Sequence, residues 1–156
     1  MLTNTLTSEA KPTVAAFKAW TRANHSLAYA VVAAQALAKV ERERVDAYIA
    51  PVFARFTFTD SRTGEPITTP KDLYRSTDEE ECAAFYAACD AAHRERGFTG
   101  EPGHCPALVA EHNATQAERA LLDSLGAFLG QDLSYVYGDM RKKALDLALG
   151  SCINAR

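Results

Sequence analysis

Cysteine and histidine side chains gather in the middle of the sequence, and they are the residues best suited to chemistry. Cys89 and His93 are four residues apart and Cys82 precedes Cys89 by seven, so a helix would project all three from one face. His104 and Cys105 follow after a glycine-rich turn that could return them toward that face. Thiolate sulfur and imidazole nitrogen are ligands that zinc prefers. The candidate metal site therefore consists of Cys82, Cys89, His93, His104 and Cys105.

The same residues have a simpler interpretation as parts of a hydrophobic core. The sequence contains no Cys-x-x-Cys pair, and the fourth cysteine, Cys152, lies far along the chain. Free cysteines are among the most buried residue types and behave as small apolar side chains. We therefore expect packed thiols, a hydrogen-bonded histidine and no cofactor, with bound zinc as the alternative.

Cys105 is also a candidate nucleophile. It lies at the start of a predicted helix, where the helix dipole favours the thiolate, and His104 or His93 would serve as the base. Side chains that are adjacent in a chain rarely point the right way to act together, and no local signature of a cysteine enzyme surrounds Cys105. The sequence therefore offers only a weak basis for nucleophilic catalysis.

Glu111 and His112 have the residue types of an acid–base pair. Neighbouring positions on a helix do not face each other, and the helical repeat predicts that His112 faces solvent. The chain also has no glycine-rich phosphate loop, no Gly-x-Ser-x-Gly and no His-Glu-x-x-His. We therefore expect a protein that is not an enzyme.

Helices must position these residues, because apolar side chains recur at three- and four-residue steps along most of the chain. The first helical stretch begins near Pro12, whose missing N–H group suits the first turn of a helix, and breaks at residues 24–26. It is expected to end at Pro51, because proline disfavours helical geometry in the residue before it.

Three further helices are predicted toward the C-terminus. One follows Ser76 and Thr77, which form a capping box with the acidic residues after them. The next covers residues 106–129, and the glycine that follows stops it. The last covers residues 139–149 and is closed by Gly150. The residues of this last helix that are expected to face inward are Met140, Ala144, Leu147 and Ala148.

Residues 56–59 alternate between phenylalanine and threonine, which is typical of a strand. A turn sequence with Gly64 separates them from residues 66–69, so we predict a short β-hairpin over residues 56–69. Because two strands alone are marginally stable in water, this hairpin should pack against the helices.

These patterns predict a mainly α fold of about five helices with one short β-hairpin. The hairpin covers residues 56–69, and a single helical domain spans residues 12–156. Residues 1–11 are expected to form a flexible N-terminus, since they are polar and rich in threonine.

Composition narrows the class of protein. The sequence has 156 residues, of which 47% are hydrophobic and 24% charged, as in an ordinary globular domain that can bury a sizeable core. Its longest mainly apolar run, Leu27–Ala38, is interrupted by Gln35 and is shorter than the roughly 20 residues needed to span a bilayer. No secretory signal is recognisable at the N-terminus, so we expect a cytoplasmic protein with reduced thiols and no membrane contact.

The charge pattern speaks against nucleic acid as a partner. The net charge is −3, and no concentrated basic face with interleaved aromatic residues is apparent. The basic residues 141–143 lie near the start of a helix and more often belong to a solvated face.

Two stretches carry a resemblance. Residues Pro102–Glu111, with the sequence PGHCPALVAE, and Ala117–Leu122, with the sequence AERALL, resemble small uncharacterised bacterial proteins of phages and integrative mobile elements. The resemblance implies a setting in which small proteins bind host machinery stoichiometrically, including as anti-defence inhibitors.

We therefore expect a non-enzymatic protein–protein interaction module with a protein partner, a second copy of the chain included. The absence of a specific catalytic motif and the alanine-rich helix faces, which suit close helix packing, support this expectation. The alternative is a small zinc-binding protein or metal-dependent enzyme that uses the central cysteines and histidines.

Overall fold

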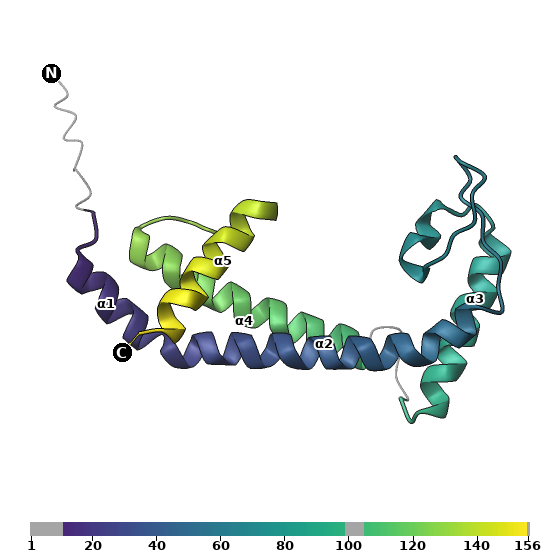
Figure 1. Cartoon of the computed structure of the whole chain (residues 1–156), viewed down its shortest axis with the longest axis horizontal. Coiled ribbons are helices and arrows are strands. Elements are labelled where there is room, and N and C mark those ends of the chain that lie inside the picture. Colours follow the sequence, from purple (N-terminus) through teal and green to yellow (C-terminus); the bar gives the residue numbers. More distant parts are fainter. Residues whose placement is uncertain (1–10, 99–104, 156) are drawn as a thin grey trace, which may run out of the picture. The chain divides into compact units, whose positions relative to one another are not determined.

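The computed structural model describes residues 11–98 and 105–155 and is mainly helical, which confirms the predicted fold class (Figure 1). Its elements are α1 (Val14–Ala23), α2 (His25–Phe53), the 3-10 helix η1 (Pro70–Arg75), α3 (Glu79–Glu95), α4 (Pro106–Leu129) and α5 (Gly138–Ile153). The predicted flexible segment, residues 1–11, lies outside the described residues apart from Lys11.

Contacts along the chain define two compact units. In the first unit, the described residues up to Gln35 pack with those from Asn113 onward. The second unit consists of residues 36–112. Both α2 and α4 contribute residues to each unit, and each unit has a hydrophobic core of its own. The boundaries of the predicted domain, residues 12 and 156, stay a prediction.

The core of the first unit contains a network built on Trp20 of α1. The Trp20 indole Nε1 donates to the carbonyl oxygen and to Oγ of Ser124, each at 3.2 Å. Ser124 Oγ in turn donates to Asn24 Oδ1 at 2.7 Å, and Asn24 Nδ2 donates to the Trp20 carbonyl oxygen at 2.9 Å. The Asn24 side chain thus hydrogen bonds to the backbone of the preceding turn, and such a bond competes with the backbone hydrogen bonds that a regular helix would make at this position. The predicted break at residues 24–26 is confirmed, with Asn24 between α1 and α2.

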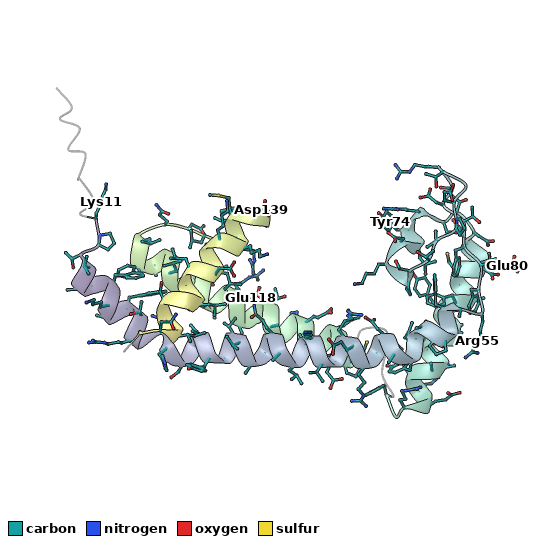
Figure 2. The ribbon with its side chains drawn as sticks, viewed as in Figure 1. Lys11, Arg55, Tyr74, Glu80, Glu118 and Asp139 are labelled. Carbon is teal, nitrogen blue, oxygen red and sulfur yellow. The ribbon has the colours of Figure 1, made fainter. Side chains whose placement is uncertain are left out.

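Glu118 of α4 connects two other helices of the first unit (Figure 2). Its carboxylate accepts from Gln35 Nε2 of α2 at 2.8 Å and lies 3.5 Å from Arg141 Nη2 of α5. Arg141, which the charge pattern assigned to a solvated face, therefore forms an ion pair with α4.

Aromatic side chains organise the core of the second unit. Phe58, in the loop after α2, is fully buried between Phe53, Phe56 and Phe85. Its ring centroid lies 5.6 to 6.0 Å from theirs. Edge-to-face and offset arrangements at such distances are the favoured geometries of aromatic pairs. The loop after α2 is thereby anchored to α3, which carries Phe85.

The prediction of a β-hairpin over residues 56–69 is wrong, because these residues do not form two paired strands. Among the described residues the only pairing of this kind is an isolated antiparallel bridge between Thr59 and Pro66. Ile67 N donates to the Phe58 carbonyl oxygen and Asp60 N donates to the Glu65 carbonyl oxygen, each at 2.8 Å, and no further ladder bond extends the pair among the described residues. The segment is closed instead by Asp60, whose carboxylate accepts from the backbone N–H groups of the turn. These side-chain hydrogen bonds hold the turn in place without a pair of strands on either side of it.

Two helix ends differ from those predicted. Helix α2 continues through Pro51 to Phe53, because a proline in the last turn removes only one backbone hydrogen bond. Helix α3 is capped by Asp78, whose Oδ1 accepts from Glu81 N at 3.0 Å, and not by the hydroxyls of Ser76 and Thr77.

The inward face of α5 was predicted correctly for Ala144 and Ala148 but wrongly for Met140 and Leu147. Met140 and Leu147 are 68% and 61% exposed, whereas Leu145, Ala148 and Cys152 are buried. The helix also runs past Gly150 to Ile153. The buried residues are three and four positions apart and so form a regular stripe, which shares Ala148 with the predicted one.

Candidate functional site

A polar contact at the core of the second unit joins Tyr48 of α2 to His93 of α3. Tyr48 Oη and His93 Nδ1 are 2.6 Å apart, and the two rings meet edge to face with centroids 5.4 Å apart. Burial, and to a lesser extent the nearby Cys105 thiol, raises the pKa of Tyr48. The phenol is therefore protonated near neutral pH, and Tyr48 Oη and His93 Nδ1 share a hydrogen bond.

Two arginines cover this pair from outside. The Arg96 guanidinium carbon lies 4.1 Å from the centroid of the Tyr48 ring, and that of Arg44 lies 5.5 Å from the centroid of the Phe98 ring. Phe98 in turn lies against His93, with centroids 6.5 Å apart. Cation–π contacts of this kind stabilise aromatic side chains at a surface. The arrangement holds His93 by packing and hydrogen bonding.

The thiols of the predicted metal site lie at the edge of the same core. Cys82, Cys89 and Cys105 are free and half-buried, and they pack against the buried residues of the second unit. Burial, and then the charge of Asp90, raises the pKa of Cys89 to about 11. Its thiol is therefore protonated at neutral pH.

Within residues 11–98 and 105–155, no group of three or more histidine, cysteine, aspartate or glutamate side chains is arranged to hold a metal ion. His104, the fourth member of the predicted set, lies outside the described residues. The zinc site at Cys82, Cys89, His93, His104 and Cys105 stays a prediction. Cys152 is buried in the core of the first unit, apart from this set.

Glu111 forms an ion pair that sequence reasoning missed. It accepts from Arg42 of α2 through two parallel bonds, Nε to Oε1 at 2.7 Å and Nη2 to Oε2 at 2.6 Å. The Arg42 hydrogen bond is the main cause that lowers the pKa of Glu111, and the same bond raises the pKa of Arg42. His112 is exposed, as the helical repeat predicts. Glu111 is thus a positioned carboxylate that ties α4 to α2 within the second unit. No local signal links residues so far apart in sequence.

One surface of the molecule is apolar without belonging to either core. We define the outer face of α2 as its exposed residues Tyr29, Val32, Ala33, Ala36, Leu37 and Val40. They are spaced by three and four positions along one continuous helix, so the helix repeat alone brings them to one side. The opposite side of the same helix carries buried residues such as Val31 and Ala38. Over this stretch α2 is apolar on both sides, which is typical of a helix that is covered all round.

Comparison of the chain with protein-family models, with curated proteins and with solved structures gives no match in any of the three. Among the described residues, no helix combines the length and apolarity needed to cross a membrane.

Proposed function

We propose that this chain is a non-enzymatic protein–protein interaction module whose contact surface is the outer face of α2. The proposal rests on one observation: large apolar side chains are exposed to solvent along one side of a helix. Tyr29 is 51% exposed, Val32 40%, Leu37 54% and Val40 58%. Single exposed apolar residues are ordinary on a protein surface, but a contiguous set is typical of an interaction site.

The free energy available at this face is consistent with binding. Full burial of a valine or leucine side chain contributes about 1.5–3 kcal/mol. Because these side chains are about half exposed already, covering each one contributes about 1 kcal/mol, or about 4 kcal/mol for the four large ones. This gain must exceed the cost of association, so a partner needs contacts beyond the face itself.

The polar groups of the candidate site favour the same proposal. The phenol of Tyr48 is hydrogen bonded to His93, the carboxylate of Glu111 is paired with Arg42, and the raised pKa of Cys89 keeps its thiol neutral. Each of these groups has a partner or a protonation state that stabilises the fold.

The resemblance to proteins of phages and integrative mobile elements supports a specific setting. In that setting the chain would act in the bacterial cytoplasm as a stoichiometric inhibitor of host machinery, as anti-defence proteins do. It would act by occupying a surface of its target, so it requires no turnover and no cofactor.

The proposal is tested with two variants of α2 that add the same charge. Val40→Glu introduces a carboxylate into the outer face, whereas Ala47→Glu introduces one at an exposed position of the same helix beyond that face. Wild-type protein and each variant are chemically crosslinked in bacterial lysate, and the crosslinked peptides are identified by mass spectrometry.

We expect crosslinks at α2 that Val40→Glu removes and Ala47→Glu retains. Equal crosslinking of all three proteins would show that the outer face does not bind. Circular dichroism of both variants checks that the helices are intact.

A further inference from the structure

We draw no further inference here: the strongest candidate, the open cleft of about 400 Å³ that Phe17 and Lys18 of α1 and Ser151 of α5 line in the first unit, carries none, because nothing in the structure shows what covers it.

Discussion

Replacing Gly126 with alanine should destabilise the first unit, although alanine is the better helix former. Gly126 lies in the last turns of α4, where the chain after the helix folds back over it. A Cβ atom at this position would lie 2.5 Å from the carbonyl oxygen of Gln131 and 3.3 Å from Cγ of Leu133. The first distance is far below van der Waals contact, and the atom concerned belongs to the backbone.

The contact cannot relax cheaply, because the returning chain is tied to the same residue. Gln131 N donates to the Gly126 carbonyl oxygen at 2.9 Å, so moving Gln131 away weakens this hydrogen bond. Overpacking of this kind costs about 1–3 kcal/mol. The gain in helix propensity from glycine to alanine is about 1 kcal/mol. Because the close contact is with a backbone atom, the cost should lie in the upper part of this range, and we expect Gly126→Ala to lower the free energy of unfolding by up to about 2 kcal/mol.

Gly150 of α5 provides the matched control. It is also a helical glycine of the first unit, and a Cβ atom there would meet nothing within 4 Å. Gly150→Ala should therefore raise the free energy of unfolding by most of the difference in helix propensity between glycine and alanine, which is about 1 kcal/mol. The two substitutions are chemically identical and should shift stability in opposite directions.

Urea denaturation followed by circular dichroism measures both differences. A thermal midpoint should fall by about 2–4 °C for each kcal/mol lost and rise correspondingly for the control. If Gly126→Ala were as stable as Gly150→Ala, the close approach of the chain to α4 would be absent in solution, and the reasoning would be refuted.

The remaining predictions concern the second unit. Tyr48→Phe removes the hydrogen bond between Tyr48 Oη and His93 Nδ1 and should lower the free energy of unfolding by about 1 kcal/mol in urea denaturation, and an unchanged midpoint would contradict the role of the bond. The pKa of Glu111 is lowered in the folded state, so its pair with Arg42 stabilises the protein above the ordinary glutamate pKa and is lost as the pH falls below it. Glu111→Gln should therefore unfold less steeply on acidification than wild type, by less than about 1 kcal/mol because the pair is partly solvated. Cys89, with its pKa raised to about 11, should be alkylated by iodoacetamide at pH 8 far more slowly than a free thiol, as peptide mass spectrometry would show. Protein purified without a metal-affinity tag should contain substoichiometric zinc by elemental analysis, and one equivalent whose removal by chelator lowers stability would establish the metal site instead.

Short-range patterns of the sequence determined most of the helices. The break at Asn24 and the end of α4 before Gly130 were predictable, because an asparagine side chain that bonds its own backbone and a glycine at positive φ act within a few residues. The same patterns failed for the hairpin, since Phe56 and Phe58 pack into the core of the second unit and only the isolated bridge between Thr59 and Pro66 forms among the described residues.

The face of α5 shows the limit of periodicity. Met140, Leu147 and Leu145 are all apolar, and each of two neighbouring stripes satisfies the helical repeat. Only packing against the other helices of the first unit decided that Leu145 is buried and that Met140 and Leu147 remain exposed.

For the candidate site, the sequence by itself determined which residues have reactive side chains and that Cys82, Cys89 and His93 belong to one helix. Tertiary structure decided their partners: Tyr48 for His93 and Arg42 for Glu111, at separations of 45 and 69 residues. Hydrogen bonds between such distant residues follow from how helices pack, and packing depends on the shapes of whole faces and not on the spacing of any one motif.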